Sequence, residues 1–577
     1  MRPGSGFAIL CACAWWLAAA EAPAAEVRFK DRCLTDVVRA VPEILASQDP
    51  RTGRFGTGIW LVTDQDVMLP LAAAWATKGR NNPYYRDPKV LQAIMAAGDA
   101  LIADQDETGQ WEFRKKDGST WGRIYMPWTY SRWIRSYGLI RDAMPPERRE
   151  RWVKGLRLGF AGISRDRLRH VHNIPSHLAM ALYFAGRYLD EPAWMQQAAE
   201  FMHKVVAAQH PDGYWSEHSG PVVNYGFVYV DAVGTYYAVS GDAAVLPALR
   251  KSAIFHMNFT YPDGTPVETV DERNPYRKDH VVPGAGFTMT AEGRGYVARQ
   301  LRLQGDAPIA ADYAASLLLY GQEGPGLPAG ELEGDHDFVL GEGSAAVRRR
   351  GPWFLVVSAM TCPVANNRWI QDRQNLFSVY HDKVGLILGG GNTKLQPGWS
   401  TFTVGDPSLL SHRQGDEEPK FQPPPGILHV PSRAKLVTGE SLGLDLEYGR
   451  QRCAVRLRVI DPNRIECMWS ATGPCEQSVA GHVTVLPRMK EKVGRAEGEG
   501  VVLSEDAFVW PAGTFGGWIE HAGLRISTPR SAAVRWPVLP HNPYRKDGRA
   551  EAGEGRLVID LPFSSEGGEQ RIGVEIP

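Results

Sequence analysis

The hydrophobic pattern of this 577-residue chain changes once, close to residue 320, and that change limits the folds it can adopt. Before it, apolar residues recur every three or four positions, which is typical of amphipathic helices. The clearest helical segments are 34–44, 90–102, 128–140, 178–188, 195–206, 228–239 and 310–319. After it, apolar and polar residues alternate in short runs separated by Gly and Pro, as in antiparallel strands. The sequence therefore predicts a multidomain α+β protein, with a helical domain before an all-β domain.

A short turn motif recurs between the predicted helices. It reads Gln48-Asp-Pro-Arg-Thr-Gly-Arg-Phe55, Gln105-Asp-Glu-Thr-Gly-Gln-Trp111 and Gln209-His-Pro-Asp-Gly-Tyr-Trp215, with a weaker copy at Tyr261-Pro-Asp-Gly-Thr265. Each copy ends a helix with a turn and then places an aromatic residue in the first three cases. Such recurrence indicates stacked helical hairpins. We expect them to close into an (α/α) toroid over residues 26–320, whose loops line one cleft; an open solenoid is the alternative.

The second half begins with a linker composition at residues 321–328, Gly-Gln-Glu-Gly-Pro-Gly-Leu-Pro. A chain of this length exceeds a single core, so a second domain is expected. The short strands predict an antiparallel β-sandwich over residues 321–577, with a small C-terminal sheet as a variant. One disulfide among Cys453, Cys467 and Cys475 is compatible with an oxidising compartment.

The first 25 residues have the features of a secretory signal. Arg2 precedes an apolar run at 7–20, and small residues at 18–25 offer cleavage sites. A membrane anchor is the alternative, but the run is too short to span a bilayer. We therefore expect a secreted or periplasmic protein that has no membrane contact once the signal is removed.

Charge and aromatic content narrow the ligands. The chain has 64 Lys and Arg against 65 Asp and Glu, so no overall positive field would attract nucleic acid. An acidic ligand would have to meet a local cluster of arginines. Aromatic faces can pack in a core or stack on sugar rings. The candidate stacking residues, for which packing within the toroid is equally consistent, are Trp111, Trp121, Trp128 and Trp215.

Five polar residues form the candidate site. His218 and Tyr225 lie seven residues apart in the loop after the third turn motif, Asn173 starts an earlier helix, and Arg273 and Arg277 follow a later one. On a toroid these segments would open onto the same face. Each has a plainer alternative, because Asn173 fits a helix N-cap, His218 a buried hydrogen-bonded histidine, and the arginines a solvated pair.

This ordered set resembles the active site of the chondroitin AC and hyaluronate lyase family of polysaccharide lyases. The shared pattern is Asp212-Gly213, His218, Tyr225-Gly226 and Asp231, with Asn173 lying 45 residues before His218 and the Arg273-x3-Arg277 pair 48 to 52 residues after Tyr225. The loop between His and Tyr is shorter here than in that family. The segment 377–388 instead resembles the β domains of heparinase II/III-type and alginate lyases, which can supply a second catalytic Tyr or His. Tyr380 and His381 are therefore further substrate-site candidates.

The resemblance implies β-elimination on a polysaccharide that contains uronic acid, such as a glycosaminoglycan or alginate. Asn173 would neutralise the substrate carboxylate, and Tyr225 and His218 would act as base and acid. The arginines would bind carboxylate or sulfate. No cofactor is expected. His170, His172 and His177 lack a carboxylate or cysteine among them, which leaves a structural divalent cation near His336 and His381 as the only metal role considered.

Two other functions fit the same sequence. A toroid glycoside hydrolase would use paired carboxylates, either Glu217 with Asp231 or Glu268 with Asp271. A non-catalytic glycan-binding protein would keep the aromatic and arginine residues and tolerate the loss of Tyr225.

Overall fold

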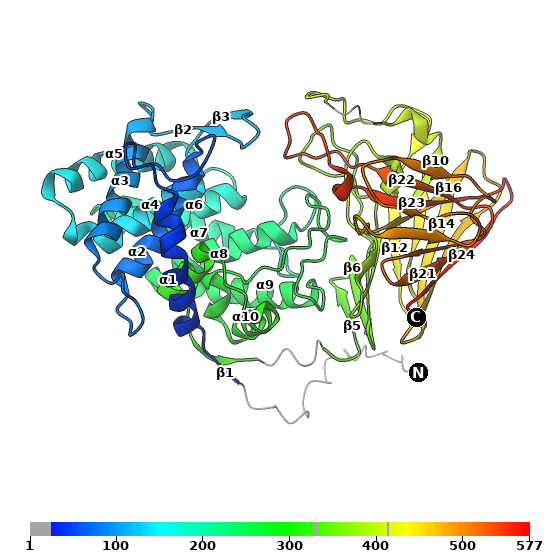
Figure 1. Ribbon diagram of the computed structural model, residues 1–577, viewed down its shortest axis with the longest axis horizontal. Helices are drawn as coiled ribbons and strands as arrows, with labels where there is room; N and C mark the ends of the chain where they lie inside the picture. The colour runs from blue at the N-terminus through cyan, green and yellow to red at the C-terminus, as the bar shows by residue number, and fades with distance from the viewer. Residues whose placement is uncertain (1–24, 328–332, 412, 414) are drawn as a thin grey trace, which may run out of the picture.

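The computed structural model describes residues 25–327, 333–411, 413 and 415–577. The predicted signal, residues 1–25, lies outside them except for Ala25. A helical half and a β half lie side by side (Figure 1). This arrangement confirms the predicted α+β class. No helix in these ranges is long and apolar enough to cross a bilayer.

The helical half is a closed ring. Its helices are α1 (Lys30–Ala46), α2 (Met68–Ala76), α3 (Pro88–Asp104), α4 (Pro127–Ile140), α5 (Pro146–Asp166), α6 (Asn173–Tyr188), α7 (Pro192–Ala207), α8 (Val223–Ser240), α9 (Leu246–Asn258), α10 (Ala291–Gln304) and α11 (Ala311–Tyr320). The first helix packs against the last. Beside them, β1 (Ala25–Val27) pairs with β4 (Gly324–Gly326). An open solenoid would leave these ends apart, so the toroid prediction holds.

The recurrent turn is a packing device. The side-chain amide of Gln209 donates to the carbonyls of Gly213 and Ala248, at 3.2 and 2.8 Å. The amide of Gln48 makes the same pair of contacts in the first copy, with Gly53 and Ala93. In each copy, these two hydrogen bonds hold the turn against the next helical hairpin.

The aromatic residue of each turn is part of the toroid core. Trp111 and Trp215 are each 2% exposed, and their indole N–H groups donate to the carbonyls of Leu101 and Val205. Neither indole can present a face to a sugar, because both faces are packed. The prediction that Trp111 and Trp215 are stacking subsites is therefore wrong.

The β half is a sandwich of two antiparallel sheets. One contains β5 (His336–Leu340), β6 (Ala345–Arg350), β7 (Trp353–Ser358), β8 (Phe377–His381), β9 (Gly385–Leu388), β10 (Phe402–Gly405), β11 (Ile427–Leu428), β16 (Val479–Val485), β19 (Phe508–Trp510), β22 (Ala533–Val538) and β23 (Arg556–Pro562). The other contains β12 (Arg433–Val437), β13 (Leu442–Tyr448), β14 (Gln451–Asp461), β15 (Arg464–Thr472), β17 (Lys492–Arg495), β18 (Val501–Val502), β20 (Trp518–His521), β21 (Leu524–Ser527) and β24 (Gly567–Glu575). Alternate apolar side chains from both sheets form one core between them.

The end of the chain belongs to this sandwich. Strand β23 pairs with β16 and β22 in the first sheet, and β24 pairs with β15 and β21 in the second. Within the described residues the C-terminal strands therefore form no separate small sheet. Cys453, Cys467 and Cys475 are free thiols, so the disulfide considered from the sequence does not form.

The two halves share a hydrophobic cluster at their contact. It joins apolar residues of α8, α9 and the following loop to β6, β7, β8 and β9. At its centre the ring of Tyr261 stacks on Tyr380, with centroids 5.1 Å apart. The Tyr261 hydroxyl also pairs with Ser378 of β8 at 2.7 Å. This packed contact fixes the β half against the loop that precedes α8 and the loop that follows α9.

Candidate active site

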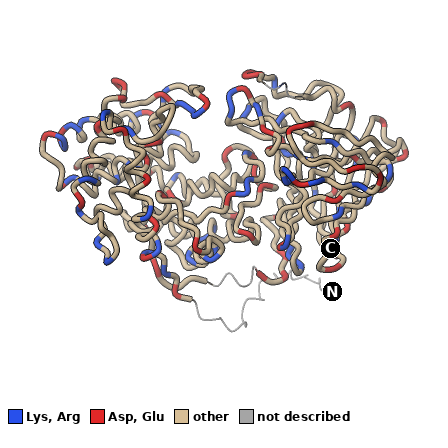
Figure 2. The backbone as a smooth tube through the Cα atoms, viewed as in Figure 1, with Lys and Arg blue, Asp and Glu red and all other residues tan. Residues whose placement is uncertain are grey.

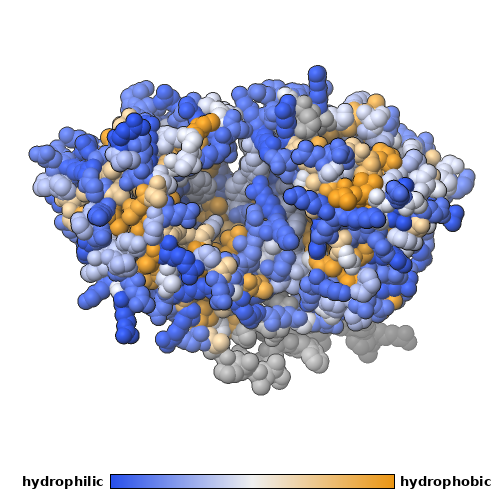
Figure 3. Space-filling model, in the orientation of Figure 1, coloured by the Kyte–Doolittle hydropathy of each residue, from blue (hydrophilic) through white to orange (hydrophobic). Residues whose placement is uncertain are grey.

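A cavity of about 500 Å³ lies where the two halves face each other. Its lining includes Tyr225 on α8, Asn274 and Arg277 in the loop after α9, and Tyr544 from the β half. Lys115, in the turn between β2 (Trp111–Arg114) and β3 (Thr120–Ile124), also lines it. The space-filling view is hollowed between the halves (Figure 3). Basic and acidic residues are interspersed over both halves (Figure 2), and the net charge is −1.

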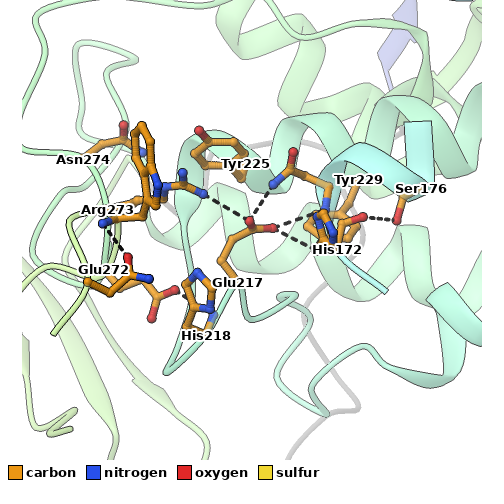
Figure 4. Close-up of polar contacts among 12 residues, drawn as sticks. His172, Ser176, Glu217, His218, Tyr225, Tyr229, Glu272, Arg273 and Asn274 are labelled. Atoms are coloured by element: carbon orange, nitrogen blue, oxygen red, sulfur yellow. Dashed lines mark hydrogen bonds and ion pairs between the residues drawn. The ribbon is translucent and has the colours of Figure 1, made fainter. Parts of the chain in front are cut away.

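Glu217 is the centre of the polar network beside this cavity (Figure 4). Its side chain is 3% exposed and accepts from the Asn173 amide at 2.5 Å and the Tyr229 hydroxyl at 2.8 Å. The Arg273 guanidinium lies 3.4 Å from the same carboxylate. Asn173 is the first residue of α6, after His172 at the cap position. Its side chain points to Glu217 rather than capping the helix, which removes the N-cap alternative.

A second buried carboxylate holds the His218 loop. The two oxygens of Glu272 accept from the backbone N–H groups of His218 and Ser219, at 2.8 and 2.6 Å. Burial raises the pKa of Glu272 to about 7, although Arg373 lies nearby and opposes the shift. The His218 ring itself is exposed. Partial desolvation lowers its pKa, against the opposing effect of Glu217, so the neutral imidazole predominates at neutral pH.

Tyr225 lies in the first turn of α8, and the Arg273 guanidinium covers its ring. The Arg273 guanidinium is 4.7 Å from the centroid of the Tyr225 ring and 5.2 Å from that of Trp369. The hydroxyls of Tyr225 and Tyr544 are 3.4 Å apart, and Tyr544 donates to the Asn274 side chain at 2.8 Å. Arg277 lies over the Tyr544 ring at 5.3 Å. The hydroxyl of Tyr225 therefore faces a group from the β half.

The five predicted residues form one connected cluster. Asn173 and Arg273 meet at Glu217, and His218 is adjacent to Glu217 in the chain. Arg273 covers Tyr225, which reaches Arg277 through Tyr544. Asn173 and His218 do not line the cavity that contains Tyr225; Glu217 and Arg273 connect them to it.

Two of the predicted aromatic residues remain near the cleft. Trp121 on β3 contacts Trp369 of the β half, with centroids 5.2 Å apart, and the Arg368 guanidinium covers it at 5.1 Å. Trp128 is partly exposed at the start of α4 and packs edge-on against His177 at 4.7 Å. Trp121 therefore joins the two halves across the rim, whereas Trp128 lies within the helical half.

Tyr380 and His381 do not reach the site. Tyr380 is 3% exposed, stacks on Tyr261 and lines a different cavity. His381 is 4% exposed, and its Nε2 lies 3.1 Å from the carbonyl of Pro462. Neither lies beside Tyr225, because β8 runs through the contact between the halves, and of the two predicted substrate-site residues only Tyr380 lines that other cavity. The β half contributes Tyr544 and Trp369 instead.

Histidines considered for metal binding contact other protein groups instead. His177 is buried with its Nε2 3.0 Å from Arg132, and the Nδ1 of His336 lies 2.9 Å from the Gly334 carbonyl. His336 and His381 therefore do not form the cation site considered for the β half. In the part of the chain that the structure describes, no three His, Cys, Asp or Glu side chains are grouped to hold a metal ion.

No family model matches this sequence, and no curated protein matches it. Solved structures are similar in fold. Heparinase III superposes with a TM-score of 0.54 at 14% identity, covering 90% of this chain and 77% of the other. The Streptomyces coelicolor A3 chondroitin AC lyase in complex with chondroitin sulphate gives 0.53 at 14% identity, covering 97% and 81%. This chain therefore has the toroid-plus-β-sandwich fold found in polysaccharide lyases.

Proposed function

We propose that this protein is a polysaccharide lyase that cleaves a uronic-acid-containing polysaccharide by β-elimination. The observation that carries the proposal is the connected cluster of Asn173, His218, Tyr225 and Arg273 beside the cavity between the halves. Its support is chemical, because the cluster contains an amide donor, two proton-transfer groups and an arginine. The fold shared with heparinase III and a chondroitin AC lyase agrees with it.

Elimination needs the uronate C5 proton to leave and the C4–O bond to break, which gives a C4–C5 double bond and a new hydroxyl on the departing sugar. Asn173 would donate to the substrate carboxylate, so that negative charge can develop there. Tyr225 and His218 would remove the C5 proton and protonate the leaving oxygen. Arg273, over the Tyr225 ring, would attract the uronate.

The geometry gives less support to a paired-carboxylate hydrolase. Glu217 already accepts from Asn173 and Tyr229 and contacts Arg273. Asp271 accepts from three backbone N–H groups, including that of Val223 at 2.8 Å. Glu268 is 3% exposed and accepts from Tyr261 and the Gly390 N–H. Carboxylates held in this way are poor candidates for a free acid and base.

The reaction is tested with the mature protein and a panel of hyaluronan, chondroitin sulfate, heparan sulfate and alginate, with a neutral glucan as control. We expect ultraviolet absorbance from the unsaturated product on at least one acidic polymer and none on the glucan. New reducing ends without absorbance would replace elimination by hydrolysis. Binding with neither signal would support a glycan-binding protein.

The pH dependence follows from His218. Because its pKa is lowered and the base must be neutral, kcat/KM should fall with decreasing pH only below about 6.5, the ordinary histidine value. His218→Gln should remove this acid limb and lower kcat. His172→Gln is the matched control, since the His172 pKa is also lowered by burial and no catalytic role is assigned to it. A limb unchanged in His218→Gln would contradict the assignment.

A further inference from the structure

A second cavity adjoins the one that contains Tyr225. It also measures about 500 Å³, within the range typical of small-molecule sites. Pro275, Arg277 and Tyr544 line both cavities, so the stacked Arg277–Tyr544 pair forms the boundary between them. Beyond it, the wall is formed mainly by the β half, from the turn between β8 and β9 to the start of β23.

The lining of this second cavity has an excess of unpaired positive charge. It includes Arg277, Lys278, Arg488 and Arg556, and among the described residues none of these forms an ion pair with a carboxylate. Among the described residues, the guanidinium of Arg488 donates only to the carbonyl of Val384.

The acidic residues of the lining are already engaged. Asp382 pairs with Arg349, with one contact of 2.9 Å. Asp263 accepts from the backbone and hydroxyl of Thr265, and Glu554 accepts from the Asn542 amide at 2.9 Å. With Lys383, the lining has five cationic side chains against these three carboxylates, so its formal charge is positive.

One of the positive charges, that of Arg556, is held in a buried position by the surrounding fold. It is 3% exposed, and its guanidinium lies 4.3 Å over the Trp399 ring. Its terminal nitrogens donate to the carbonyls of Glu554, Gly555 and Gly390, and its Nε is buried without an acceptor. Burial lowers the pKa of Arg556 to about 10, an effect that the charges of Glu268 and Glu554 oppose without forming an ion pair with it. A Cβ at Gly390, which has φ +101°, would lie 2.2 Å from that Nε, so only glycine leaves room.

Each half contributes to the cavity wall one copy of the same six-residue sequence. Asn-Pro-Tyr-Arg-Lys-Asp occurs at 274–279, after the toroid turn, and again at 542–547, in the β half. The arginine of the first copy stacks on the tyrosine of the second, and that tyrosine donates to the asparagine of the first. A ligand in this cavity would therefore contact both halves at once.

We propose that the second cavity is a binding subsite for an anionic sugar unit, carboxylated or sulfated, of a polysaccharide that also occupies the cavity at Tyr225. The identity of the polymer rests on the proposed function. Arginine forks bind carboxylate and sulfate in two-point contacts, which suits Arg488, while the buried Arg556 contributes its charge to the wall. A chain that fills both cavities passes over Arg277 and Tyr544, so its scissile bond lies a defined number of units from the bound charge.

The test removes two accessible positive charges. Arg556 is left unchanged, because losing this buried side chain would destabilise the fold. Lys278→Gln/Arg488→Gln is compared with Arg433→Gln/Lys435→Gln, an equal charge change on the exposed strand β12. Calorimetric titration uses glucuronate, N-acetylglucosamine 6-sulfate, inorganic sulfate and glucose. We expect both anionic sugars to bind wild type and the β12 variant alike, and at least about tenfold more weakly to the cavity variant, a difference of about 1.4 kcal/mol. On a cleaved polymer, KM should rise by a similar factor, with a smaller change in kcat.

The outcomes separate this subsite from the reaction. Charge-dependent sugar binding without any unsaturated product would refute the lyase and keep the subsite. Elimination with KM and sugar affinity unchanged in the cavity variant would refute the subsite and keep the lyase. Inorganic sulfate that binds as tightly as the sugars would overturn the sugar assignment, as would equal binding of glucose.

Discussion

Tyr225→Phe is expected to lower kcat roughly 10²- to 10⁴-fold, the range for loss of a positioned proton-transfer group. The hydroxyl contacts only Tyr544, at 3.4 Å, so its removal should change the free energy of unfolding little. KM should also change little, because the ring and its contact with Arg273 remain. The measurement is steady-state formation of the unsaturated product beside a thermal unfolding curve.

Tyr237→Phe is the matched control for this change. Tyr237 lies on the same helix, α8, and its hydroxyl makes no hydrogen bond in the described structure. It should keep wild-type kcat. If Tyr225→Phe retains activity within a few-fold of wild type, Tyr225 is not the proton-transfer group, and the role passes to His218 alone.

Glu217→Ala should destabilise the helical half and also abolish turnover. Removing one partner from a buried ion pair costs about 3–5 kcal/mol, and Glu217 is 3% exposed beside an Arg273 that is 13% exposed. Asn173 and Tyr229 would lose their common acceptor as well. The loss is measured by denaturant unfolding followed through the helical circular dichroism signal.

Two further variants separate stability from catalysis. Glu217→Gln keeps the side-chain volume and an acceptor oxygen but loses the charge facing Arg273, so it should retain more stability than the alanine variant and still lower kcat. Glu150→Ala removes an exposed glutamate that pairs with Lys154 on the surface of α5. Its cost should stay below about 1 kcal/mol. Equal effects of Glu217→Ala and Glu150→Ala would show that the Glu217 network contributes little.

The sequence predicts the architecture well because each half has its own hydrophobic period. The periodicity did not reveal every helix, and the surroundings of α2 and α5 explain why it missed these two. Residues Met68–Trp75 of α2 are all buried, so α2 reads as a continuous apolar run without a polar face. The charged first turns of α5 conceal its apolar stripe, which includes Trp152 and Phe160. Periodicity reveals helices that have two different faces, and it fails where a helix is buried all round.

The site is predicted in part, for a different reason. Asn173, His218, Tyr225, Arg273 and Arg277 come from loops whose shared face follows from the toroid itself. The aromatic residues after the turns were misread, although their recurrence in successive copies is what a structural role produces. Tyr544 was missed because its approach to Tyr225 depends on how two domains dock, which no local pattern encodes. The repeated hexapeptide at 274–279 and 542–547 was the one signal available.

The stacked Tyr261–Tyr380 pair has a mechanical consequence. It lies in the apolar cluster on the side of the molecule where β5 and β6 approach α9, whereas β3 lies at the opposite edge of the helical half (Figure 1). Trp121 of β3 contacts Trp369 of the β half. A packed cluster resists separation more than a single aromatic contact does. A rotation about this cluster would therefore separate the tryptophan pair more than the cluster itself. Under the proposed function, a long polymer would enter sideways through that gap, without being threaded from one end.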